Sequence, residues 1–218
     1  GSGEYFGGLN QEAASSGYTR EEVLRVLQET GLYTGHCYYP FPDYRFTMSL
    51  YSDVQLPKVG ELIDQTGNFG QDRLILFDET KAVNVVIEKG RFREFANSYL
   101  LVAGKQKKTA VCNEKGEEIV FVKFSNDRAE NRNIRTCITV GEENDRHVYK
   151  LADQPQALPQ ITGMEEACRN LNTQFEATKF QVNRYLACPG GAEFEFLQGT
   201  TMEEIVDRLL EQGRMDEA

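Results

Sequence analysis

The sequence predicts a mixed α+β fold, in which a remnant of an α/β domain is followed by an antiparallel sheet. Three observations lead to this prediction. Capped amphipathic segments near both ends of the chain indicate helices, and period-two alternation in the second half indicates strands. A lysine-rich stretch over 105–108 separates the two patterns. We therefore expect two parts, residues 4–104 and residues 105–218.

A helix is expected to open the first part. Thr19 and Glu22 have the spacing of a capping box, in which each side chain bonds a free backbone N–H at the helix start. Gly31 stands where such a helix would end, because glycine readily adopts the left-handed conformation of a helix terminus. A strand is predicted next, at 36–39, and it is expected to end at Pro40.

Residues 40–70 form a turn-rich stretch with many aromatic side chains and weak periodicity. An irregular excursion of this length is either functional or packed onto the domain as an insertion. After it, the apolar patterns predict a strand at 73–77, a helix at 81–89 and a strand at 98–103.

The second part has the pattern of an antiparallel sheet. Residues 113–116 carry the asparagine and glycine of a hairpin turn, with a strand expected after them at 119–124. Apolar residues then alternate with polar ones over 134–140, which is typical of a half-buried strand. The next strand is expected at 148–151.

Two more helices are predicted from capping pairs. Thr162 with Glu165 would begin one, and Thr200 with Glu203 would begin the last, which has the clearest apolar stripe. Between them we expect two strands, at 180–187 and 192–197.

Composition excludes several classes of protein. The 218-residue chain has a net charge of −10, which argues against general nucleic-acid binding because that requires a basic surface. No run of 18 apolar residues predicts a membrane span, and the first residues do not resemble a signal peptide. The five cysteines are widely spaced, so neither a zinc site nor a disulfide framework is expected. We expect a cytoplasmic protein.

Two lysines interrupt apolar strands, Lys123 and Lys150. Such a lysine either projects into a cleft and neutralises phosphate charge, or protects an edge strand from aggregation. The order of elements favours the first role for Lys150. Three antiparallel strands lead to it, and a helix, two strands and a final helix follow, which is the order of a kinase-type nucleotide lobe.

In such a lobe a glutamate of the helix holds the strand lysine. Glu166 is the candidate, since Glu165 is assigned to the cap, and the alternative is that Glu166 is simply solvated. We predict that Lys150 and Glu166 face each other, about 3–4 Å apart in an active arrangement. Ser125 and Asn126 would occupy the turn that covers phosphates, and Gln198 would lie in the hinge.

An aromatic group offers a second candidate site. Tyr39, Phe41 and Tyr44 are suited to stacking on a sugar or base, and the alternative is that they pack the insertion onto the domain. We identify no catalytic residue and no metal ligand. No glycine-rich strand-to-helix motif is present, so we expect no S-adenosylmethionine binding by this chain.

Several stretches of the chain are recognisable together. They are 38–44 (Tyr-Tyr-Pro-Phe-Pro-Asp-Tyr), 51–53 (Tyr-Ser-Asp), 76–79 (Leu-Phe-Asp-Glu), 95–101 (Phe-Ala-Asn-Ser-Tyr-Leu-Leu), 122–128 (Val-Lys-Phe-Ser-Asn-Asp-Arg) and 194–201 (Phe-Glu-Phe-Leu-Gln-Gly-Thr-Thr). The chain resembles bacterial proteins of cell-surface polysaccharide synthesis that join a class I S-adenosylmethionine-dependent methyltransferase to a kinase-like domain. The resemblance runs from about residue 5 to residue 211.

The resemblance implies that residues 4–104 are the end of a methyltransferase, with an insertion at 40–70, and that residues 105–218 are a kinase-like nucleotide lobe. The glycine-rich cofactor-binding half and the second kinase lobe are not in the sequence. We therefore expect a fragment that is inactive alone. Its parent would use S-adenosylmethionine and ATP with magnesium.

The expected partners are the rest of the parent polypeptide and a polysaccharide or sugar nucleotide. Two rival interpretations stay open. The chain is either a non-catalytic module that binds a glycan or protein through residues 40–70, or a stand-alone kinase-like regulatory lobe that binds a nucleotide.

Overall fold

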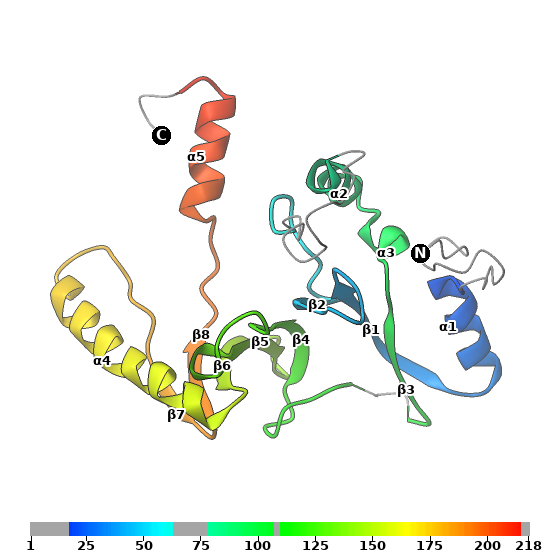
Figure 1. Cartoon of the computed structure of the whole chain (residues 1–218), viewed down its shortest axis with the longest axis horizontal. Helices are drawn as coiled ribbons and strands as arrows, with labels where there is room; N and C mark the ends of the chain where they lie inside the picture. Colours follow the sequence, from blue (N-terminus) through cyan, green and yellow to red (C-terminus); the bar gives the residue numbers. More distant parts are fainter. Residues whose placement is uncertain (1–17, 63–77, 107–109, 215–218) are drawn as a thin grey trace.

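The protein is built on one open antiparallel sheet with helices packed against it. The computed structural model describes residues 18–62, 78–106 and 110–214. Within these residues the sheet has eight strands in the order β3-β1-β2-β4-β5-β6-β8-β7. This confirms the mixed α+β class. Figure 1 shows α4 at one end of the molecule, α1 at the other, and α5 extending away from the sheet after β8.

The bounds of the elements are as follows. The helices are α1 (Arg20–Glu29), α2 (Glu79–Glu88), α3 (Phe92–Phe95), α4 (Leu158–Phe175) and α5 (Met202–Glu211), with 3-10 turns η2 (Glu130–Arg132) and η3 (Pro155–Ala157). The strands are β1 (Tyr33–Phe41), β2 (Ser49–Ser52), β3 (Leu100–Gly104), β4 (Glu118–Lys123), β5 (Ile134–Val140), β6 (Arg146–Ala152), β7 (Leu186–Cys188) and β8 (Gly191–Glu195).

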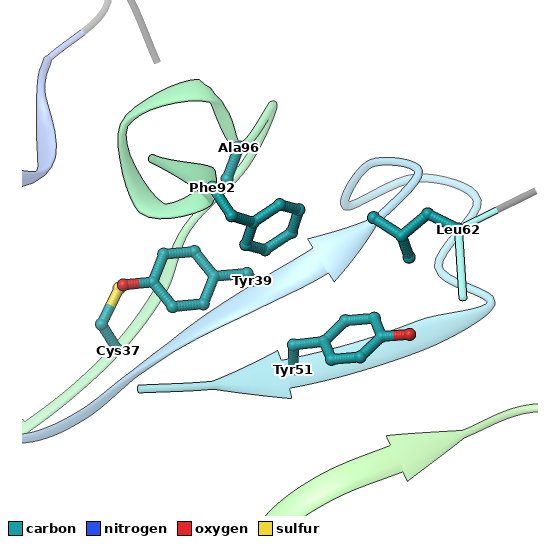
Figure 2. Close-up of a cluster of buried hydrophobic side chains, with 6 residues drawn as sticks. All are labelled: Cys37, Tyr39, Tyr51, Leu62, Phe92 and Ala96. Carbon is teal, nitrogen blue, oxygen red and sulfur yellow. The ribbon is translucent and has the colours of Figure 1, made fainter. Parts of the chain in front are cut away.

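One apolar cluster holds β1 and β2 against α3. Tyr39 and Tyr51 lie opposite each other on the two strands, and the ring of Phe92 from α3 packs edge-on against both. Figure 2 shows these rings with Cys37, Leu62 and Ala96 around them. Edge-to-face aromatic contacts add to the burial of apolar area. This cluster is the core of the first part of the chain.

A second cluster holds α4 on the other end of the sheet. Ile161 of α4 is fully buried against Ala192 and Phe194 of β8 and against Ile134 of β5. A third cluster lies on the opposite face of the sheet, around Tyr149, and it joins β4, β5 and β6. The strands of the second part are therefore packed on both faces.

The sheet continues across the predicted boundary at residue 105. Ser49 and Leu50 of β2 lie opposite Lys123 and Val122 of β4, so strands from both parts belong to the same sheet. The connection from β3 to β4 contains residues 107–109, which lie outside the described residues. The division into two domains at this point stays a prediction.

Of the four predicted helix starts, one agrees with the structure and three differ. The helix predicted from residue 81 begins at Glu79 as α2. Thr19 and Glu22 form the predicted capping box at α1. In α5 the box is formed by Thr201 and Glu204, one residue later than predicted. The prediction that α4 begins at Thr162 is wrong.

The helix α4 instead begins at Leu158, with Pro159 in its first turn. Proline suits that position because its fixed φ is helical and its missing N–H would have no partner there. Thr162 therefore lies inside the helix, and its hydroxyl donates to the carbonyl of Pro159.

Three strand predictions need correction. β1 continues through Pro40 to Phe41. The pairing of β1 with β3 ends at Tyr38, so the backbone N–H that Pro40 lacks would have no partner on that side of the strand. β2 lies within the stretch expected to be irregular, and β7 replaces the longer strand predicted at 180–187. The predicted strand at 73–77 lies outside the described residues.

Candidate functional site

Lys150 lies on the face of the sheet that α4 covers, which is the face that the sequence predicts. Its neighbours two residues away on β6, Val148 and Ala152, pack in the cluster around Ile161 of α4. Side chains two apart on a strand point to the same face. The position of Lys150 is thus fixed by the alternation along β6.

A polar row crosses this face between the two apolar clusters. Lys123 on β4 lies opposite Thr136 on β5, and Thr136 lies opposite Lys150 on β6. Residues that lie directly opposite share a face of the sheet. Phe121, two residues before Lys123, packs against the first cluster. The row therefore begins beside the aromatic cluster at Lys123 and ends at Lys150, between Val148 and Ala152 of the α4 cluster.

The ammonium group of Lys150 is half-buried and faces other cations. Its Nζ donates to Oγ1 of Thr136 at 3.4 Å. Burial lowers the pKa of Lys150, and the positive charges of Lys123 and Arg128 lower it further. Within the described residues none of these three cations forms an ion pair. In a chain of net charge −10, this is a local excess of positive charge.

No family model, curated protein or solved structure matches this chain.

The predicted ion pair between Lys150 and Glu166 is not formed in the described part of the chain. Met164 and Cys168 direct α4 toward the sheet, and Glu166 lies midway between them in sequence. Successive residues of an α-helix are rotated by about 100° around its axis, so Glu166, two positions from both Met164 and Cys168, points to the side of α4 away from the sheet. Glu166 is accordingly exposed to solvent.

Two of the other predicted nucleotide contacts, Ser125 and Asn126, hold the loop between β4 and β5, and the third, Gln198, lies in the linker before α5. The hydroxyl of Ser125 donates to the carbonyl of Ile134, and the amide of Asn126 donates to the carbonyl of Thr47. Gln198 is exposed between β8 and α5. The structure thus brings Ser125 near the start of β5 but does not gather these residues around Lys150. Their roles as nucleotide contacts stay predictions.

The aromatic candidates are not equally accessible. Tyr39 is 0% exposed, and its hydroxyl donates to Asp53 at 2.7 Å, so its ring belongs to the core. Phe41 packs against the same cluster. Tyr44 is 67% exposed, with the guanidinium of Arg45 over its ring. Of the three, Tyr44 has the ring that a ligand would reach.

Sequence reasoning missed an ionic network around Asp53. Its carboxylate accepts from Tyr39 and pairs with Arg20 of α1 at 3.1 Å and with Arg93 of α3 at 3.0 Å. Burial acts to raise the pKa of Asp53, but the hydrogen bond from Tyr39 and the charge of Arg20 outweigh it and hold the pKa below its usual value. These contacts fasten both helices to the sheet.

A second network, also missed, covers the face opposite α4. Glu117 accepts from Thr139 at 2.7 Å and from Tyr149 at 2.8 Å. His147 bonds Asp145 at 2.7 Å and Glu193 at 2.9 Å. The signal in the sequence was the alternation of His147 and Tyr149 with Val148 and Lys150 on β6, which sends the two pairs to opposite faces.

Among the residues that the structure describes, no group of three or more histidine, cysteine, aspartate or glutamate side chains is arranged to hold a metal ion. Among the helices of those same residues, none is long and apolar enough to cross a membrane.

Proposed function

We propose that the second part of the chain is a nucleotide-binding lobe and that Lys150 contacts the phosphate groups of the nucleotide. The observation that carries this proposal is a half-buried lysine that has cations rather than carboxylates as its charged neighbours. Lys123 and Arg128 both act on its charge. Such an arrangement is typical of a site that receives an anion.

The electrostatic argument is direct. A desolvated ammonium group is unfavourable unless a negative charge compensates it, and like charges nearby add to the cost. A phosphate chain would supply several negative oxygens to Lys123, Arg128 and Lys150 at once. Charge-assisted hydrogen bonds of this kind are stronger than neutral ones.

The order of elements supports the same function. Strands β4, β5 and β6 are antiparallel neighbours, α4 follows and packs on the face of Lys150, and β7 and β8 come next. A linker and α5 complete the order expected for a kinase-type lobe. The wider proposal comes from the resemblance alone: the lobe belongs to a larger sugar-modifying methyltransferase with a kinase-like domain. Weak affinity for ATP is then expected, because a second lobe would supply half of the cleft.

The test is binding of ATP and of inorganic triphosphate by calorimetry at low ionic strength, where phosphate contacts are least screened. We expect Lys150→Gln to weaken both ligands at least tenfold, or about 1.4 kcal/mol. Lys89→Gln is the matched control, since it removes the same charge from an exposed helix end. Adenosine should bind the wild type and the Lys150 variant equally.

Equal triphosphate affinity in the wild type and in both variants would remove Lys150 from the site and with it this proposal. Circular dichroism of each variant checks that the fold is retained.

A further inference from the structure

A surface hollow lies where the loop after β4 meets the start of α4. It is open to solvent and has a volume of about 900 Å³. Its lining includes two arginines and three residues with side-chain amides, Arg128, Arg132, Asn131, Gln156 and Gln160, together with Ala129 and Pro159. None of the residues predicted from the sequence as a nucleotide contact lines it.

Both walls of the hollow are held by backbone contacts. The N–H of Arg132 donates to the carbonyl of Ala129 at 2.7 Å, which closes η2. The N–H of Asp153 donates to the carbonyl of Asn133, which ties the approach to η3 to the end of η2. On the other wall, Pro159 stiffens the first turn of α4. The lining side chains therefore project from a fixed frame.

The charge of the lining is uncompensated. Neither Arg128 nor Arg132 forms an ion pair among the described residues, and Glu130, on the same turn as Arg132, is not part of the lining. A guanidinium presents paired donors that match a phosphate group. Side-chain amides both donate and accept, which suits hydroxyl groups.

We propose that this hollow is a second ligand site, which binds a phosphate monoester carrying hydroxyl groups, with Arg132 as its principal phosphate contact. The site does not depend on nucleotide binding at Lys150. Arg128 is the residue that the two sites share, since it lines the hollow and also acts on the charge of Lys150. A ligand here would lie next to the phosphates of a nucleotide.

Glucose 6-phosphate, inorganic phosphate and glucose serve as probes in calorimetry at low ionic strength. We expect glucose 6-phosphate to bind at least tenfold more tightly than inorganic phosphate, because the amides add contacts to its hydroxyl groups, and glucose alone to bind most weakly. Arg132→Gln should weaken glucose 6-phosphate at least tenfold. The affinity of Arg132→Lys for glucose 6-phosphate should lie between those of the wild type and Arg132→Gln, because lysine keeps the charge but loses the paired donors.

Arg25→Gln is the matched control, since Arg25 is exposed on α1, a helix that forms no part of the hollow. Gln160→Ala should reduce the advantage of glucose 6-phosphate over inorganic phosphate. The site is overturned if Arg132→Gln binds glucose 6-phosphate as tightly as Arg25→Gln does. Equal affinity of the wild type for glucose 6-phosphate and inorganic phosphate would overturn the ligand class.

The two proposals are separated by crossing the variants and probes. Arg132→Gln should leave triphosphate binding within about twofold, and Lys150→Gln should leave glucose 6-phosphate binding within about twofold. If Lys150→Gln loses affinity for triphosphate but Arg132→Gln binds glucose 6-phosphate normally, the second site alone is contradicted. If Arg132→Gln loses affinity for glucose 6-phosphate but Lys150→Gln binds triphosphate normally, nucleotide binding at Lys150 alone is contradicted.

Discussion

At the scale of single residues, His147 couples the stability of the sheet to pH. The hydrogen bond from its ring to Asp145 raises its pKa; burial opposes this effect, and the charges of Glu117 and Glu193 add to it. A histidine whose pKa is higher in the folded state stabilises the fold while it is protonated. That contribution is fully present below its unfolded value, 6.5, and is lost as the pH rises through the folded value.

We therefore predict that the free energy of unfolding of the wild type falls as the pH rises above about 6.5 and through the folded pKa of His147. The free energy of unfolding of His147→Gln should be lower at acidic pH and should change less as the pH rises, because glutamine does not titrate. Urea unfolding at a series of pH values measures both curves. Parallel curves for the two proteins would show that His147 makes no such contribution.

Lys150 illustrates how far a residue can be placed from sequence. Its face follows from the alternation along β6, which is local. Its cationic neighbours come from β4 and from the loop after it, and their approach depends on the pairing of three strands. Glu166 was misplaced for the related reason that the turn of α4 facing the sheet is set by tertiary packing at Met164 and Cys168.

At the scale of elements, α5 is capped but makes little tertiary contact. Its residues Met202, Ile205 and Leu210 are exposed, and among the described residues its one ion pair with another segment joins Glu204 to Lys58, in the loop after β2, at 3.8 Å. Short helices are marginal in water without packing, so its stability depends on local interactions. It is expected to open independently of the sheet.

We predict that Thr201→Ala removes about 1 kcal/mol of helix stability and raises amide exchange in α5 roughly fivefold. Global unfolding in urea should not change. Thr19→Ala is the matched control, because it breaks the same motif in α1, whose Arg20 is tied to Asp53, and it should lower global stability. Hydrogen exchange by mass spectrometry reports both effects. Slow exchange throughout α5 in both proteins would contradict the prediction.

The capping errors show why element boundaries are hard to derive from sequence. Thr200 and Thr201 each have a glutamate three residues later, so the local pattern fits two registers equally well. At α4, Thr162 with Glu165 imitates a helix start inside the helix. β2 has only four residues. Its partner β1 lies just before it in the chain, but its other partner, β4, is distant in sequence, so local patterning distinguishes β2 poorly from a loop.

At the scale of the whole molecule, one face of the sheet carries two apolar clusters, and the polar row of Lys123, Thr136 and Lys150 runs from one toward the other. The cluster with Phe92 belongs to the first part of the chain, and the cluster with Ile161 to the second. Two registered pairs of β2 with β4 join the parts through the sheet, the ring of Phe121 packs on Tyr51, and the hydroxyl of Tyr38 donates to the carbonyl of Ile119. We expect this junction to be less stable than the packing within each part.

Calorimetry is therefore predicted to resolve two thermal transitions. Ile161→Ala should cost about 2–5 kcal/mol and lower one transition, because it leaves a cavity under α4. Phe92→Ala should lower the other by a similar mechanism. A single transition lowered by both substitutions would mean that the sheet unfolds as one unit.

The strand order also bears on how fast the two parts form. β4, β5 and β6 follow one another in the chain and lie side by side in the sheet, so their pairing closes short loops. The pairing of β2 with β4 must bring together residues separated by the whole segment between Ser52 and Glu118. Closing a longer loop costs more entropy, and non-local pairing slows folding. The three-stranded meander would thus be the early folding nucleus, onto which the first part of the chain assembles in a later and slower phase.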